Sequence, residues 1–129
     1  MRGGLATYLD MTHREHPEIA EVDTEGFAEL PKAGVLAIDF TAAWCGPCKV
    51  MKPVLAGLAA EYAGRARIVA IDVDREQVVS QHYNVRSMPT LVILRDGREV
   101  GRIVGSRPRA FVAGVLDRAL AGDVAIASP

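Results

Sequence analysis

The chain has 129 residues, of which half are hydrophobic and 24% are charged, and this composition is typical of one globular domain rather than of a disordered chain. A formal net charge of −1 excludes a strongly basic protein that binds nucleic acid through bulk electrostatics. Only two cysteines occur, which excludes a secreted scaffold held together by several disulfides.

The first part of the chain is predicted to hold a polar extension and two short elements. The extension covers residues 1–17 and either forms a short helix or is disordered. A short strand is expected at residues 18–22. Thr24 is then expected to cap a short helix, which Pro31 stops.

Two buried strands are predicted on either side of a longer helix. Residues 35–40 form a nearly continuous apolar run, which is typical of a strand buried on both faces. From Cys45 onward, apolar residues recur at three- and four-residue spacing, which indicates a helix that ends at Gly64. Residues 67–73 are the next buried strand.

A capping motif predicts the helix that follows. Asp74 has Gln77 three residues later, and such a pair satisfies the free N–H groups at a helix start. We expect this helix to run to about His82. Pro89 then interrupts the chain.

The chain is predicted to finish with a hairpin and a helix. Residues 90–94 and 99–104 are strand-like runs on either side of Asp96 and Gly97, a pair typical of a tight turn. Apolar residues at helical spacing then predict a last helix over residues 108–120.

The order of these elements predicts the fold class. Parallel crossovers come first and a hairpin comes last, which indicates an α/β fold with a mixed central sheet of about five strands and helices on both faces. We expect one domain over residues 18–121, preceded by the extension and followed by a frayed tail at 122–129.

Charge is unevenly distributed along the chain. Residues 1–44 carry eight acidic and three basic side chains, whereas residues 45–129 carry eight acidic and twelve basic ones. Either these charges only keep the surface solvated, or the basic part steers acidic partners. The basic side chains considered for such a surface are Arg86, Arg95, Arg98, Arg102, Arg107 and Arg109.

The two cysteines form the motif Cys45-Gly46-Pro47-Cys48, where a predicted buried strand turns into a helix. Cys45 falls at or near the helix cap, where free N–H groups and the helix dipole stabilise an anion. This environment lowers the thiol pKa from ~8.5 into a reactive range. Cys48 lies one helical turn further on, so the two sulfurs can join. The motif therefore predicts a redox-active pair.

Two other interpretations of the pair stay open at this point. Half of a zinc site would need further ligands, and no second Cys-x-x-Cys pair exists unless a dimer shares the metal. Inert core cysteines are disfavoured because Trp44 and Gly46 mark an exposed turn. We therefore expect no metal.

Residues 44–49, Trp-Cys-Gly-Pro-Cys-Lys, resemble the active-site motif of the thioredoxin family. The similarity extends over roughly residues 18–121 and implies a thioredoxin fold. The other residues that match the family pattern are Asp39, Pro53, Met88, Pro89, Thr90, Gly97 and Gly105.

The resemblance implies a protein-disulfide reductase. By this resemblance Cys45 is the exposed nucleophile that attacks a substrate disulfide, and Cys48 is the thiol that resolves the mixed disulfide. Asp39 matches the buried aspartate of the family. On a buried strand its carboxylate loses contact with water, which raises its pKa, and we expect it to take the proton from Cys48.

The resemblance also implies a substrate-binding surface. Pro89 matches a proline that is cis in the family, although an ordinary trans turn is the alternative. The backbone of Met88 is expected to pair with an extended substrate segment, as an added strand does. The residues expected to contact substrate are Trp44, Gly46, Pro47, Met88, Pro89 and Gly105.

Two positions depart from the family pattern. Thr41 stands where many members have a second tryptophan, and Ala70 stands where many have a lysine near the buried aspartate. Without that lysine the ionised form of Asp39 loses one stabilising charge, so its pKa is expected to be higher.

The expected partners follow from the same resemblance. No phosphate-binding glycine loop or dinucleotide fingerprint occurs, so we expect no bound cofactor and a thioredoxin reductase as electron donor. Disulfide-containing proteins would be the substrates of what we expect to be a monomer. The alternatives are an exported, specialised thiol–disulfide oxidoreductase and a binding module that works regardless of redox state.

The ends of the chain lead us to expect a cytoplasmic protein that associates with neither membrane nor nucleic acid. No stretch approaches the ~20 apolar residues of a membrane-spanning helix. Residues 1–10 also lack the apolar run and cleavage site of a secretory signal. A signal sequence upstream of Met1 would support the exported alternative.

Overall fold

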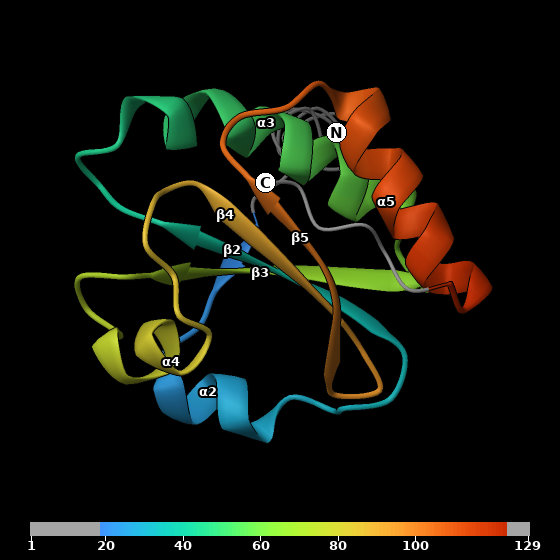
Figure 1. The fold of residues 1–129 in the computed structure, drawn as a ribbon, viewed down its shortest axis with the longest axis horizontal. Helices are drawn as coiled ribbons and strands as arrows, with labels where there is room; N and C mark the ends of the chain where they lie inside the picture. The colour runs from blue at the N-terminus through green and yellow to red at the C-terminus, as the bar shows by residue number, and fades with distance from the viewer. Residues whose placement is uncertain (1–18, 124–129) are drawn as a thin grey trace, which may run out of the picture.

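Five strands form one mixed sheet in the computed structural model, which describes residues 19–123 (Figure 1). The strands lie in the order β1-β3-β2-β4-β5, with β1, β3 and β2 parallel and with β4 antiparallel to both of its neighbours. Their bounds are β1 (Ala20–Glu21), β2 (Val35–Thr41), β3 (Ala66–Asp72), β4 (Thr90–Arg95) and β5 (Arg98–Val104).

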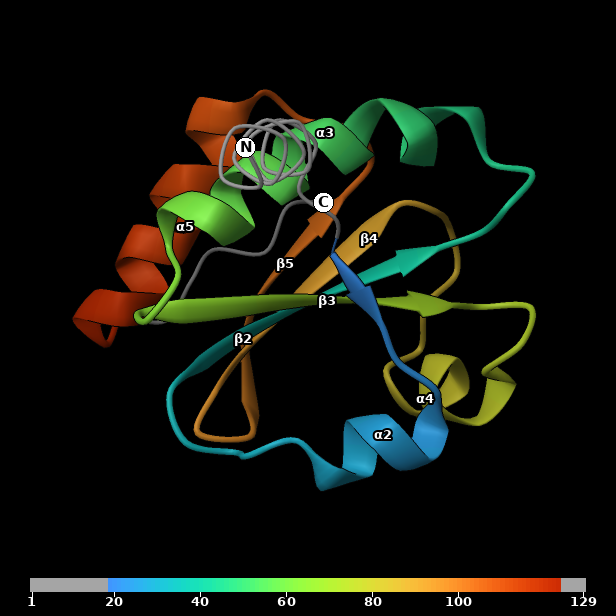
Figure 2. The same ribbon diagram turned by 180° about the vertical axis from the view of Figure 1, so that it is seen from behind.

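Helices cover both faces of this sheet, as Figures 1 and 2 show from opposite sides. The helices are α2 (Thr24–Glu29), α3 (Gly46–Glu61), α4 (Gln77–His82) and α5 (Arg109–Ala121). The pair α3 and α5 lies on one face, and the pair α2 and α4 lies on the other. The predicted α/β class and its layered arrangement are therefore confirmed.

The central strand β2 is buried on both faces, as its apolar run predicted. Val35 and Ala37 belong to the core beneath α3 and α5. Leu36, Ile38 and Phe40 belong to the second core, on the side of α2 and α4. Because side chains alternate along a strand, Asp39 points to the same face as Ala37, the face that α3 covers.

The end of β2 determines where α3 begins. The strand finishes at Thr41, and α3 starts at Gly46, so the turn between them lies at the carboxyl end of a central strand. In open α/β sheets this edge is where ligand sites are found. The two cysteines belong to this turn and to the first turn of α3.

Asp23, and not Thr24, is the N-cap of α2, so that part of the prediction is wrong. The Asp23 carboxylate accepts the backbone N–H of Gly26 at 2.6 Å. Thr24 is the first residue of the helix, and both its N–H and its hydroxyl donate to the Glu76 carboxylate. The hydroxyl that was expected to cap α2 instead ties it to the segment before α4.

The predicted capping box at Asp74 and Gln77 is also wrong. Helix α4 begins at Gln77, and its N-cap is Glu76, whose side chain makes no capping bond. The segment before it is a turn, because the carboxylate of Asp72 accepts the N–H groups of Asp74 and Arg75 at 2.9 and 3.1 Å.

The remaining predicted boundaries differ by small shifts. Helix α3 ends at Glu61, and Gly64 lies in the following turn with φ +85°, a conformation that glycine adopts without strain. The predicted extension, residues 1–17, lies outside the described residues, as does residue 18. So does the tail from residue 124. None of the helices in residues 19–123 has the length and apolar character of a membrane-spanning segment.

We predict that Asp23→Ala lowers the free energy of unfolding by about 1 kcal/mol, since the first turn of α2 loses its capping acceptor. Chemical denaturation of the oxidised protein measures this loss. Glu29→Ala, an exposed change in the same helix, is the control and is expected to alter stability by less than about 0.5 kcal/mol. Equal stability of the two variants would contradict the assigned cap.

Candidate active site

The sulfur of Cys45 caps the N-terminus of α3. Cys45 is the N-cap residue in an extended conformation, and its Sγ accepts the backbone N–H of Cys48 at 3.2 Å. Pro47 occupies the first turn, where a missing N–H costs no helical hydrogen bond. The helix therefore directs its free N–H groups and the positive end of its dipole at this sulfur.

The two cysteines are joined by a disulfide, with their Cα atoms 5.3 Å apart. The expectation that Cys45 is exposed is wrong. Only 4% of Cys45 and 1% of Cys48 is exposed to solvent. Both pack with Ala42 and against Val73 and Met88. Cys45 remains the more accessible of the two sulfur-bearing residues.

The turn around the cysteines is exposed, as expected. Gly46 and Pro47 lie at the surface, and Trp44 is 67% exposed. The Trp44 indole N–H donates to the carboxylate of Asp74 at 2.8 Å. This bond holds an otherwise exposed ring beside the disulfide. Asp74 is thus the partner of this indole and not the helix cap that its spacing to Gln77 predicts.

Two loops bring the other expected contact residues to the cysteines. Met88 packs against the cysteine pair, and the Met88–Pro89 peptide bond is cis, as expected. Gly105 donates its N–H to the Pro89 carbonyl at 2.8 Å and has φ +87°. A residue with a side chain would be strained in that conformation, so the family glycine fits the geometry.

Asp39 is a buried carboxylate with unsatisfied hydrogen-bonding capacity. It is 1% exposed, and among the described residues its Oδ1 has no hydrogen-bond partner. Its neighbours in the sheet register are Ala70 on β3 and Leu91 on β4, neither of which offers a side-chain donor. Loss of hydration raises the pKa of Asp39 to about 6.

Lys52 is the positive charge that acts on Asp39, and no sequence motif singles it out. The Lys52 ammonium partly opposes the effect of burial and lowers the Asp39 pKa. The family pattern directs attention to position 70 on the neighbouring strand, where this chain has alanine. Helical spacing could have indicated Lys52. It lies one turn beyond Cys48 on α3, the helix that covers the face of β2 to which Asp39 points.

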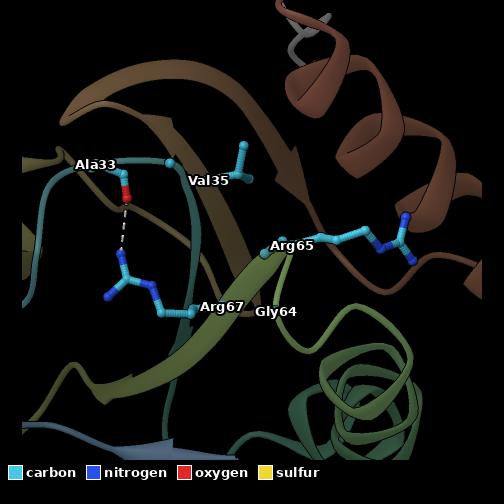
Figure 3. A pocket seen from close by; sticks show the side chains of 7 residues that line it. Ala33, Val35, Gly64, Arg65 and Arg67 are labelled. Carbon is cyan, nitrogen blue, oxygen red and sulfur yellow. Dashed lines mark hydrogen bonds between the residues drawn. The ribbon is translucent and has the colours of Figure 1, made fainter.

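A surface pocket of about 360 Å³ lies at the opposite end of the sheet, where β2 and β3 begin. Figure 3 shows that its two arginines diverge. Arg67 donates to the carbonyl oxygens of Pro31 and Ala33, whereas Arg65 extends toward α5. The two guanidinium groups therefore do not converge on a single ligand position. The pocket is also remote from the cysteines.

The zinc interpretation requires further ligands beside the two cysteines. Across residues 19–123, no three side chains of His, Cys, Asp or Glu come together as metal ligands do.

Comparison with known proteins places this geometry in a family. The family model described as Thioredoxin matches residues 18–118, which include both cysteines, Asp39 and the Met88–Pro89 segment. This chain belongs to the thioredoxin family. Relatives named thioredoxin from Staphylococcus aureus strains Mu50 and MW2 are each 43% identical over 102 residues, covering 79% of this chain and 98% of the relative.

Solved structures share the fold. A mutant thioredoxin from Halobacterium salinarum matches with a TM-score of 0.70 and 31% identity, over 78% of this chain and 88% of that one. A second match has a TM-score of 0.68 and 38% identity, over 77% and 94% of the two chains. It comes from a study of thiol resolution in yeast mitochondrial 1-Cys peroxiredoxin via glutathione/thioredoxin systems. The family match and the Cys45–Cys48 pair identify the chain as a thiol–disulfide oxidoreductase.

We predict that Asp39→Asn becomes progressively more stable than the wild type as pH rises. The folded wild type binds the Asp39 proton more tightly than the unfolded chain does, so its stability falls as pH rises from the usual pKa value of 3.8 to about 6. Above about pH 6 the full cost of the buried charge is present, and by the size of the pKa shift it is about 3 kcal/mol.

Denaturant unfolding of both oxidised proteins at a series of pH values measures this difference. The advantage of the variant should grow by about 2.4 kcal/mol between about pH 4, where Asp39 of the unfolded chain is already partly ionised, and pH 7.5, and then level off. A difference that stays constant across this range would show that Asp39 titrates alike in the folded and unfolded states.

Proposed function

We propose that Cys45 and Cys48 carry out the protein-disulfide reduction of this family, with Cys45 as the attacking and Cys48 as the resolving sulfur. The observation that carries this assignment is the capping bond, because Cys45 Sγ accepts the Cys48 N–H at the start of α3. The helix N-terminus favours the thiolate of Cys45 over its thiol, and the thiolate is the nucleophile.

The reaction proceeds through two exchanges. In the first, the Cys45 thiolate attacks one sulfur of a substrate disulfide; the substrate S–S bond breaks, a mixed disulfide forms, and the other substrate sulfur leaves and is protonated. In the second, Cys48 loses its proton and attacks Cys45 Sγ. The Cys45–Cys48 disulfide forms, the second substrate thiol is released, and two electrons have passed to the substrate.

Asp39 is the proposed acceptor of the Cys48 proton, directly or through a water molecule. It lies on the face of β2 that α3 covers, and α3 carries Cys48. A general base is most effective when its pKa lies near the working pH, because it is then ionised and still binds a proton well. The Asp39 pKa of about 6 lies close to neutral pH. Lys52 keeps that pKa from rising further and so favours the ionised, proton-accepting form.

The proposed substrate surface surrounds the disulfide. Its exposed side consists of the Trp44 ring, Gly46 and Pro47, and its other side consists of Met88 and Gly105. The backbone before β4 would pair with an extended substrate segment, which provides affinity without reading side chains. Pro89, which holds Gly105 through its carbonyl, completes this second side.

We propose a thioredoxin reductase as the electron donor and the cytoplasm as the compartment of action. The family assignment supports the donor, since the oxidised pair must be reduced after every turnover. A reducing compartment suits a protein that delivers electrons to disulfides. We further propose that the working unit is the monomer with a single domain over residues 18–121, because the site is assembled from one chain.

The direct test combines the protein with NADPH, a thioredoxin reductase and a disulfide-bonded protein such as insulin. We expect NADPH oxidation that requires both the protein and the disulfide substrate. The double variant with Cys45→Ser and Cys48→Ser is the matched control and is expected to be inactive. Full biological activity of that double variant would instead indicate a redox-independent binding module.

We predict that Cys48→Ser traps substrates as stable mixed disulfides, because the second exchange has lost its nucleophile while the first is intact. Mass spectrometry under non-reducing conditions detects the adducts at Cys45. Cys45→Ser is the control and should trap far less substrate. Equal trapping by both variants would contradict the assignment of roles.

We predict that Asp39→Asn slows release of the mixed disulfide at pH 7 by about tenfold or more, since general base catalysis is typically worth ~10²–10⁴-fold. The deficit should shrink as pH rises, because Cys48 then ionises without the help of Asp39. Single-turnover quenched flow measures the release step separately from formation of the mixed disulfide. An unchanged release rate at pH 7 would remove Asp39 from the proton transfer.

A further inference from the structure

The segment after β3 lies beside the turn that carries the cysteines. Thr41 and Asp72, the last residues of β2 and β3, are register partners in the sheet. One residue later, the Val73 N–H donates to the Thr41 carbonyl at 2.9 Å. The Val73 side chain packs against the cysteine pair. The two strand ends therefore stay together until one segment turns toward Cys45 and the other turns toward α4.

Asp72 fixes the turn that follows it. Its carboxylate accepts the backbone N–H groups of Asp74 and Arg75 at 2.9 and 3.1 Å, and its carbonyl accepts the Glu76 N–H at 2.9 Å. An aspartate that binds N–H groups two and three residues further on restrains the backbone between them. Glu76 in turn accepts the N–H and the hydroxyl of Thr24. The turn is therefore held at both ends, with the backbone of Asp74 between them.

The carboxylate of Asp74 restrains the Trp44 ring. The indole Nε1–H donates to Oδ2 of Asp74 at 2.8 Å. Because 67% of Trp44 is exposed, packing restrains this ring little, whereas a hydrogen bond is directional. A carboxylate is also a stronger acceptor than a neutral oxygen. The bond therefore selects one of the orientations that the exposed ring could otherwise adopt.

We propose that Asp74 is a positioning residue for disulfide exchange, which holds the Trp44 ring in the orientation that a protein substrate meets, and that Asp72 sets the turn from which Asp74 does so. The proposal rests on the proposed function, because it requires that Trp44 contacts substrate. Trp44 directly precedes Cys45, so the orientation of the ring shapes the surface next to the attacking sulfur. A ring that is fixed in advance lowers the entropy cost of binding.

The first measurement follows the ring itself. Trp44 is the only tryptophan of the chain, so the fluorescence anisotropy decay of the reduced protein reports the motion of this ring alone. We expect Asp74→Ala to increase the amplitude of fast ring motion, since exposed side chains reorient in picoseconds to nanoseconds when nothing restrains them. Asp74→Asn should stay close to the wild type, because the amide oxygen can still accept the indole N–H.

The second measurement follows the reaction with two disulfides of different size. Quenched flow with thiol alkylation measures the second-order rate constant at which the reduced protein is oxidised by insulin or by 2-hydroxyethyl disulfide. With insulin, we expect Asp74→Ala to lower this constant by roughly threefold to tenfold, the usual net worth of one hydrogen bond. With the small disulfide, which offers little surface beyond its sulfurs, the constant should change by less than about twofold. Asp74→Asn should restore most of the rate with insulin.

Double variants test whether the effect passes through the ring. In a Trp44→Phe background, which lacks the indole N–H, Asp74→Ala should cause no further loss with insulin. Asp72→Ala should cause a smaller loss than Asp74→Ala, and combining these two changes should be no worse than Asp74→Ala alone. Glu29→Ala removes an exposed negative charge on α2 and is the matched control for net charge. It should react with both disulfides as the wild type does.

The proposal is overturned if Asp74→Ala leaves the ring motion or the rate with insulin unchanged, or if it slows both disulfides equally. A loss that persists in the Trp44→Phe background, or an equal loss in Glu29→Ala, overturns it too, because the effect would then not pass through the ring. Asp72→Ala without any loss would remove Asp72 from the positioning of Trp44. A wild type that reduces neither disulfide would instead overturn the proposed function, so the two failures are distinguishable.

Discussion

The capping bond between the Cys45 sulfur and the Cys48 N–H is the interaction on which the site depends. A helix N-terminus needs an acceptor, and most helices use an oxygen from Ser, Thr, Asp or Asn. In the proposed mechanism the acceptor is also the attacking atom. The same hydrogen bond and helix dipole therefore stabilise both the start of the helix and a thiolate at Cys45. Pro47, in the first turn, has no backbone N–H to donate.

The buried carboxylate shows the opposite relation between stability and chemistry. Asp39 lies between Ala70 and Leu91 in the middle of the sheet and has an oxygen that no described residue satisfies. An apolar residue there would suit the core better. The carboxylate destabilises the fold above about pH 6, the range in which it can accept a proton. Its presence in an otherwise apolar strand supports the proposed role of Asp39 as a proton acceptor.

Most of the fold could be predicted because its strands are apolar runs with clear interruptions. The run at 35–40, the turn at Asp96 and Gly97, and the helix that follows the cysteines each carry a strong local signal. The helix starts were less predictable. Asp23 and Thr24 are both good capping residues, and in the fold the Thr24 hydroxyl donates instead to Glu76, which lies far along the chain. A local motif contains no information on such a partner.

The site was predictable in its chemistry but not in its surroundings. The motif identified Cys45 and Cys48, yet the residues that help to bury them include Val73 and Met88, which only folding brings to the pair. The same holds for two other neighbours that folding brings together. Lys52 lowers the pKa of Asp39, and the Asp74 carboxylate accepts the Trp44 indole N–H.

The position of β4 in the sheet has a consequence for the newly made chain. β4 follows β2 only after two further helices and a strand, yet it pairs directly with β2, and Met88 immediately precedes the cis proline that leads into it. During synthesis the thiols emerge from the ribosome long before the segment that encloses them. The two thiols of the nascent polypeptide therefore stay unenclosed until β4 has been translated.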